Sequence, residues 1–350
     1  MKQYIIIPLL LLLLLSCSER KQYDFSEIPE RALRSEILFE ESDRIFIGNT
    51  HMFCAVDSFI FILDKYEDKN FTLINTKNGN TARICPVGQG PGEIINPSPF
   101  VNIINRDGSG LSLAIYDISY SKLFVYNLDS ILVNDNTKAF ETVSLVPGSL
   151  EKGGIHTHIQ ILNDSLWIGS GIYLDGVFSF FKDGIRQREI VDLFINDPFV
   201  SKFQQALRDA NVFKTSRNKL QLVRSSQNGG LIEAYSIDED TLKNNFSHKY
   251  FKPEYAVNNN GYLVSSNGSR YGYIDVCISS DRAFGLYSGK KIQESDSFQS
   301  RFVHVYDFTG ELLEILVLDR PVCAIDVSMN EDTLYAIDAS GERKIVAFKL

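Results

Sequence analysis

Three glycines alternate within residues 85–94, which read CPVGQGPGEI. The candidate stretch inside them consists of Gly88, Gln89, Gly90, Pro91, Gly92 and Glu93. Glycine-rich loops beside a charged residue often bind phosphate, so this stretch is the first place to look for chemistry. A phosphate loop needs a lysine and a serine or threonine after its last glycine, and a dinucleotide loop needs the spacing GxGxxG. Neither pattern is present, so the stretch is neither a phosphate loop of this kind nor a dinucleotide-binding loop.

The same stretch is typical of a shaped turn. Glycine allows positive φ, and Pro91 fixes its own φ, so the sequence predicts one specified loop conformation. Glu93 is expected to accept hydrogen bonds from N–H groups of the loop. We favour this structural interpretation and leave a contribution to ligand binding open.

A second candidate is the pair His156 and His158 in GGIHTHIQIL. Alternate residues of a strand share a face, so both imidazoles would reach one metal ion. Two histidines make an incomplete site, and the sequence identifies no third ligand. The favoured alternative is two polar residues at an interface between packed sheets. Calcium or zinc in a central channel stays an open possibility on this evidence.

Other enzyme signatures are missing from the sequence. It contains no GxSxG, no HExxH and no calcium loop with EF-hand spacing. Four aspartates recur near the ends of expected strands, where they would either close turns or line a channel; they are Asp117, Asp275, Asp326 and Asp338. No catalytic residue is assigned.

A repeat of about 50 residues positions these candidates. Each unit has a second strand followed by a third, with turn residues between them. The second strands open at Phe59, Leu111, Leu166, Leu220, Ala283 and Leu334, and the third strands cover 71–75, 123–127, 177–181, 231–236, 302–307 and 345–349. Six units with about four strands each predict an all-β fold, a six-bladed β-propeller, with an elongated β-solenoid as the rival.

The segment SEILFEE at 35–41 precedes the first unit and reads as an unattached strand. The last unit lacks an outer strand, so pairing the two would close the ring and remove two exposed edges. The sequence therefore predicts a propeller closed by an N-terminal strand. One stretch departs from the repeat: Phe199, Phe203 and Leu207 are four apart, which predicts a short helix with these residues on one face.

The N-terminus has the pattern of an exported protein. Lys2 precedes an apolar run from Ile5 to Leu15, which is too short to span a bilayer and is typical of a signal peptide. Cys17 follows Leu-Leu-Ser directly, as in the lipobox of bacterial lipoproteins, and this resemblance implies cleavage before Cys17 and lipidation of its thiol. The expected organisation is a signal peptide over 1–17, a polar tether over 18–34 and the propeller over 35–350.

Composition and net charge limit the classes of partner that the protein is expected to bind. The chain has 350 residues and a net charge of −9, which argues against general nucleic-acid binding. The other cysteines form no CxxC and lie in apolar stretches, so they are expected to be buried small hydrophobic residues; they are Cys54, Cys85, Cys277 and Cys323.

The lipobox, the repeat and the string GQGPGE together resemble the TolB-like six-bladed propeller lipoproteins of Gram-negative envelopes. The last unit, CAIDVSMNEDTLYAIDASGERKIVAF, also resembles an NHL-type blade. The resemblance covers about 35–350 and implies a propeller in the cell envelope, attached to a membrane through its lipid and facing the periplasm or the cell surface. It implies no reaction. The expected function is a scaffold that binds a protein, a small molecule or a glycan. The alternative is a metal-assisted hydrolase or lyase that uses the central channel.

Overall fold

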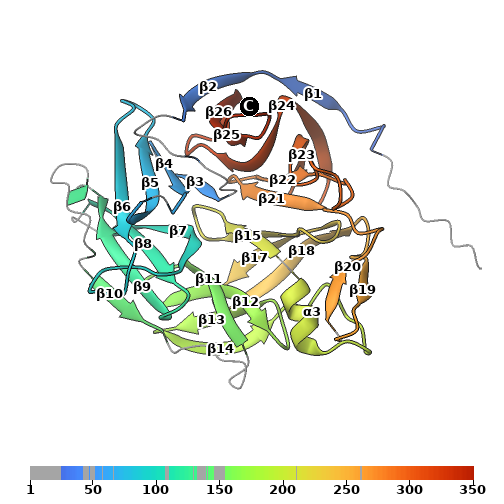
Figure 1. Ribbon diagram of the computed structural model, residues 1–350, viewed down its shortest axis with the longest axis horizontal. Helices are drawn as coiled ribbons and strands as arrows, with labels where there is room; N and C mark the ends of the chain where they lie inside the picture. The colour runs from blue at the N-terminus through green and yellow to red at the C-terminus, as the bar shows by residue number, and fades with distance from the viewer. Residues whose placement is uncertain are drawn as a thin grey trace, which may run out of the picture.

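The structure is a computed structural model that describes residues 25–41, 47, 52–56, 58–65, 67–106, 110–128, 130–131, 139, 141–145, 154–209, 211–260 and 262–350. Cys17, the expected signal peptide and residues 18–24 of the expected tether lie outside these ranges. Nearly all regular elements are strands, and their sheets are arranged around a central axis (Figure 1).

Four blades are separate four-stranded antiparallel sheets, each written here from its first strand in the chain to its last. Blade 1 comprises β3 (Phe53–Val56), β4 (Phe59–Leu63), β5 (Lys69–Asn75) and β6 (Thr81–Pro86). Blade 2 comprises β7 (Pro97–Arg106), β8 (Gly110–Asp117), β9 (Lys122–Asn127) and β10 (Glu141–Ser144). Blade 3 comprises β11 (Gly154–Ile161), β12 (Leu166–Tyr173), β13 (Phe178–Lys182) and β14 (Ile185–Ile190). Blade 4 comprises β15 (Asn211–Thr215), β16 (Gln221–Ser226), β17 (Leu231–Asp238) and β18 (Thr241–Lys249).

Blades 5 and 6 are joined into one sheet by a long shared strand, β24 (Leu312–Val327). Its first part pairs with β23 (Ser300–Asp307) as the outer strand of blade 5, which also contains β21 (Tyr273–Ile278) and β22 (Arg282–Tyr287). Its last part, from Val322, pairs with β25 (Thr333–Asp338) as the inner strand of blade 6, which continues with β26 (Lys344–Lys349). All six predicted pairs of second and third strands are therefore present.

The blades pack face to face, and both faces of their middle strands are buried. Strand β4 reads FIFIL and is buried at four consecutive positions, because each face meets a neighbouring blade. The core is divided into clusters that lie between adjacent blades rather than into one central core. All four expected cysteines are buried free thiols, as predicted; they are Cys54, Cys85, Cys277 and Cys323.

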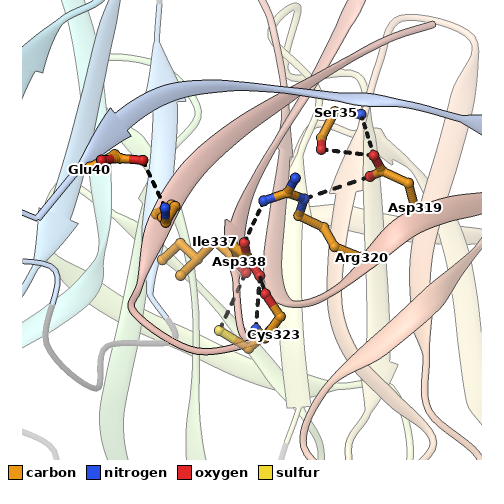
Figure 2. Close-up of polar contacts among 9 residues, drawn as sticks. Ser35, Glu40, Asp319, Arg320, Cys323, Ile337 and Asp338 are labelled. Atoms are coloured by element: carbon orange, nitrogen blue, oxygen red, sulfur yellow. Dashed lines mark hydrogen bonds and ion pairs between the residues drawn. The ribbon is translucent and has the colours of Figure 1, made fainter.

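The predicted closing strand is confirmed. Strand β2 (Ser35–Glu40) pairs antiparallel with β26 and completes blade 6. Figure 2 shows the polar contacts that hold it: the N–H and the hydroxyl of Ser35 donate to Asp319, and Lys344 donates to Glu40 at 2.7 Å. Arg320, which follows Asp319 in strand β24, donates to the Asp338 carboxylate at 2.7 Å. The two ends of the propeller chain are therefore joined by a sheet and by side chains.

The expected tether over 18–34 is partly wrong, because its described end belongs to the fold. Strand β1 (Glu30–Leu33) lies parallel to the first part of β24 and adds a further strand to blade 5. Leu33 is buried in the core cluster of blades 5 and 6, and Arg31 forms a two-pronged ion pair with Glu314. The sequence signal for strand β1 was weak, since one large apolar residue, Leu33, among charged residues is typical of a linker. In Figure 1 β1 and β2 form one arc over the outside of blades 5 and 6.

Two insertions lie at the joints on either side of blade 4. The predicted helix exists as α3 (Lys202–Arg208), with Ser201 as its N-cap. The predicted buried face is wrong: Phe199 is 96% exposed and Leu207 is 47% exposed. The helix instead buries Gln204 and Gln205.

Those glutamines are buried because they satisfy backbone groups of neighbouring segments. Gln204 accepts from the Leu263 N–H, and Gln205 donates to the carbonyls of Asp197 and Val200. Leu263 belongs to a hairpin of β19 (Tyr255–Val257) and β20 (Leu263–Ser265) between blades 4 and 5. This hairpin accounts for the longest interval of the repeat, from Leu220 to Ala283. No helix in the described part of the chain has the length and apolar character needed to cross a membrane.

Candidate functional site

The inner strands of the blades surround a channel with a cavity at each end. Early residues of β3, β15 and β21 line one cavity of about 420 Å³, which also contacts α3; we call it the upper cavity. Late residues of the same strands line a second cavity of about 310 Å³, the lower cavity. Since the strands start at one mouth and end at the other, the two cavities occupy opposite ends of the channel.

The upper cavity combines apolar walls with a few polar groups. Phe53, Val212, Ile274 and Phe298 are among its apolar lining residues. Thr157, His158, Ser170 and Gln227 add hydrogen-bonding groups. Burial lowers the pKa of His158 to about 4, so its imidazole is neutral at pH 7 and presents one donor and one acceptor. Few polar groups on an apolar wall is the usual composition of a small-molecule site.

Lys214 separates the two cavities, because it lines both of them. It extends from blade 4 toward blade 6, where its Nζ lies 3.4 Å from Oδ2 of Asp326. Burial opposes its charge, but the nearby Asp326 and Asp275 carboxylates raise the pKa of Lys214 overall. Burial also raises the pKa of Asp275 to about 7, against the opposing effect of Lys214. The waist of the channel therefore holds a permanent cation beside two carboxyl groups.

Polar side chains on the inner strands bond the backbone of the next blade. Asp275 accepts from the Ile325 N–H at 2.8 Å, and Asp326 accepts from the Ala55 N–H at 2.9 Å. The same kind of contact recurs from inner strands at two other joints, Asn102 with Ile159 and Ile161 and Gln160 with Thr215. At a third joint the donor is Gln227, in the turn after β16, which bonds the carbonyl of Ile274. These contacts fix the blades at the axis, so the channel walls are positioned by hydrogen bonds as well as by packing.

The four aspartates singled out in the sequence divide into two groups. Asp117 and Asp338 end second strands and accept hydrogen bonds from the following turn, at Ser119 and Ser340. Asp275 and Asp326 lie on inner strands and face the channel waist. Lys214 was missed in the sequence; its only signal is a single cation directly after the apolar pair Val212 and Phe213.

The glycine-rich stretch lies between β6 and β7, at the crossover from blade 1 to blade 2. The Glu93 carboxylate accepts from the Gly90 N–H at 2.7 Å, which is the contact expected of it. Asn70 donates to the carbonyls of Cys85 and Ile94 at the two ends of the loop. Asp117 of blade 2 accepts from the Ile95 N–H at 2.8 Å. The loop is therefore held by a hydrogen bond within itself and by hydrogen bonds from residues outside it. A role for the loop in binding stays a prediction.

Gly88→Ala is expected to lower the free energy of unfolding by about 2 kcal/mol, because a Cβ at residue 88 would lie 2.0 Å from Oε2 of Glu93 and would displace that carboxylate from the Gly90 N–H. Equilibrium urea unfolding measures the change. Gly341→Ala is the matched control, since a Cβ there meets no atom within 4 Å. Equal stabilities of the two variants would show that Glu93 does not fasten the loop.

The expectation that His156 and His158 share a strand face is wrong. A β-bulge lies between them in the pairing of β11 with β12, so His156 pairs with Gly171 and His158 with Ser170. His156 packs against Phe181 and bonds the Tyr173 hydroxyl at 2.9 Å, whereas His158 faces Phe213 of blade 4. The two imidazoles therefore point to opposite neighbouring blades. Within the described ranges, no group of three or more His, Cys, Asp or Glu side chains is arranged to hold a metal ion.

Comparison with known proteins gives a family and a fold. A family profile described as TolB-like 6-blade propeller-like matches residues 40–330. A search of curated proteins found no match. Among solved structures, a member of the DUF4221 family from Bacteroides vulgatus aligns with a TM-score of 0.54 at 11% identity, over 92% of this chain and 97% of that one. A luciferin-regenerating enzyme aligns with a TM-score of 0.49 at 11% identity, over 87% and 93%. At 11% identity, the alignment with the DUF4221 protein shows similarity of fold only.

Proposed function

The chain belongs to the TolB-like six-bladed propeller family, and we propose that it is a lipid-anchored envelope protein whose propeller binds a small amphipathic molecule in the upper cavity. The observation that carries this proposal is the cavity of about 420 Å³ at one mouth of the channel. Its volume lies within the usual range for small-molecule sites, about 300–1,000 Å³.

The lining favours a ligand with an apolar ring and hydroxyl groups. Phe53 and Phe298 offer ring faces, and the neutral His158 together with Gln227 offers donors and acceptors. Aromatic residues beside amide and imidazole groups suit a glycoside or a similar molecule. Because the blades are bonded to each other at the axis, this wall is largely fixed before a ligand arrives, which lowers the entropic cost of binding.

A panel of aromatic glycosides, screened by ligand-observed NMR against the purified propeller, tests the cavity. Leu207 lines it from α3 and is half exposed, so Leu207→Trp is expected to fill the space and weaken any bound glycoside at least tenfold. Leu313→Trp, at a partly exposed leucine on the outer strand of blade 5, is the control and should leave binding unchanged. If binding is unchanged in Leu207→Trp, or if no member of the panel binds, aromatic glycosides are excluded as ligands of the upper cavity.

The anchor part of the proposal rests on the sequence around Cys17. The full-length chain, expressed in a Gram-negative bacterium, is expected to partition into the detergent phase of a phase-separating detergent. Cys17→Ala should move it to the aqueous phase. Equal partitioning of the two chains would exclude lipidation at this cysteine.

A further inference from the structure

The lower cavity differs from the upper one in its charge. Its volume is about 310 Å³, and it is lined by the ends of the inner strands and by the turns that follow them. Of the described residues that line it, three are cations and one is an acid: Lys214, Arg217 and Lys219 face Asp326. This excess of positive charge stands against a whole chain whose net charge is −9. A cleft lined by one sign of charge concentrates ligands of the opposite sign.

Arg217 and Lys214 are held in place by blade 6, across the channel axis from blade 4. The Arg217 guanidinium donates to the carbonyls of Val327 and Met329 in blade 6 and in the turn after it. Lys214 contacts Asp326, which precedes Val327 on β24. The two cations are therefore positioned before any ligand binds, and carbonyl contacts leave the charge of the guanidinium unneutralised by those groups.

Lys219 is the member whose charge is least compensated. Its Nζ lies 3.3 Å from the Thr215 hydroxyl, and no carboxylate among the residues that the structure describes comes within ion-pair distance of it. Burial lowers the pKa of Lys219 to about 8. Its backbone has a φ of 60°, a left-handed conformation that favours glycine or asparagine, yet the position carries a lysine. An anionic group beside Nζ would restore the stability of the ammonium form.

The remaining wall of the lower cavity is apolar. Val56, Leu111, Ile278 and Val327 line it beside the cations. An ion such as free phosphate would leave this surface in contact with water, whereas an organic anion would cover it. Burial of apolar surface contributes about 25 cal/mol per Å², so the body of the ligand adds affinity to its charge.

We propose that the lower cavity is a second binding site for a small organic anion whose charged group meets Lys219, Arg217 and Lys214 and whose apolar body lies against Val56, Leu111 and Ile278. The three cations outnumber Asp326 and the nearby Asp275, so the cavity carries an excess of positive charge for the ligand to neutralise. A phosphate monoester and an aromatic dicarboxylate both have this chemistry. The site is separate from the upper cavity, since Lys214 stands between them.

Isothermal titration with phenyl phosphate and with phthalate tests this site on the purified propeller at pH 7.5 and low salt. At least one of the two is expected to bind, and inorganic phosphate is expected to bind at least tenfold more weakly than phenyl phosphate. Which of the two organic anions binds more tightly tells a phosphate ligand from a carboxylate ligand. Absence of binding by both, or equal affinity for inorganic and phenyl phosphate, would overturn the proposal.

Variants connect the binding to the cavity. Lys219→Gln should weaken the bound anion at least tenfold, and Lys219→Arg, which keeps the charge, should retain most of the affinity. Lys243→Gln removes a lysine from the exposed face of the outer strand of the same blade and is the matched control. If Lys219→Gln fails to fold, Arg217→Gln provides the same comparison. Equal affinity in the cavity variants and in Lys243→Gln would place the anion elsewhere and overturn the assignment.

Discussion

Glu233→Gln is expected to lower the free energy of unfolding by about 3 kcal/mol, because it removes one partner of a buried ion pair. Arg224 and Glu233 lie on β16 and β17 of blade 4, are 2% and 5% exposed, and approach to 2.5 Å. Tyr235 and Ser247 also donate to the Glu233 carboxylate. Glutamine keeps the volume but leaves the buried guanidinium without its counter-charge.

The pH dependence of this effect has a definite sign. Burial acts to raise the pKa of Glu233, but Arg224 and the two hydroxyl donors outweigh it, so the pKa is lowered in the folded protein. A lowered pKa stabilises the fold above the ordinary glutamate value, about 4.3, and this stability is lost as the pH falls through the folded-state value. The difference between the wild type and Glu233→Gln should therefore be full at pH 7 and shrink below about pH 4.

Equilibrium urea unfolding across this pH range measures both the loss and its dependence. Glu36→Gln is the control, because Glu36 is also on a strand but is exposed, and its substitution should change stability by less than about 0.5 kcal/mol. A loss for Glu233→Gln that stayed constant down to pH 3 would mean that the carboxylate charge is not what stabilises blade 4.

Removing residues 25–41 is expected to destabilise the whole propeller by about 5 kcal/mol or more. The deletion takes away β1 and β2, the burial of Leu33 and the Arg31–Glu314 ion pair. It also exposes the edges of β24 and β26, which unpaired would promote self-association. Thermal unfolding and size-exclusion chromatography of a chain that starts at residue 42 measure the two effects.

Point variants separate burial from the mere presence of the segment. Leu33→Ala should cost about 3 kcal/mol, because Leu33 is 8% exposed in the core cluster of blades 5 and 6. Ile37→Ala, at a residue of β2 that is 43% exposed, should cost less than about 1 kcal/mol. Similar costs for the two, or a truncated chain that melts at the same temperature as the intact one, would contradict the closed ring.

The sequence predicted the architecture well because the repeat depends on local signals. Alternating apolar runs and turn residues located every second and third strand, and the unpaired run SEILFEE indicated the closure. The sequence did not predict strand β1 or the buried face of α3, because their partners are distant in sequence. Nothing near Leu33 indicates that β24 lies beside it, and the apolar spacing of Phe199 and Leu207 gave no hint that Gln204 would bond the hairpin backbone.

The candidate sites show the same limit. The shaped turn of the glycine-rich loop could be predicted because residues that bond its backbone, including Glu93, lie close in sequence. The histidine pair was misjudged, since a β-bulge is set by pairing with β12 and reverses one side chain relative to the other. The channel residues Lys214, Asp275 and Asp326 come from three blades, so only ring closure brings them together. A charged residue inside an otherwise apolar strand was the one available signal.

The closing strand also sets the order in which the molecule can be completed. Ser35 pairs with Phe348, so β2 cannot pair until a strand more than 300 residues later in the chain has been synthesised. Contacts of such long sequence separation form late and slow folding, since the intervening chain must be organised first. Blades 1 to 4 need only their own strands and can form as they emerge. The ring is therefore expected to remain open until the last blade is available, and the interval before closure is when the unpaired edges of blades 5 and 6 are most accessible to chaperones or to other chains.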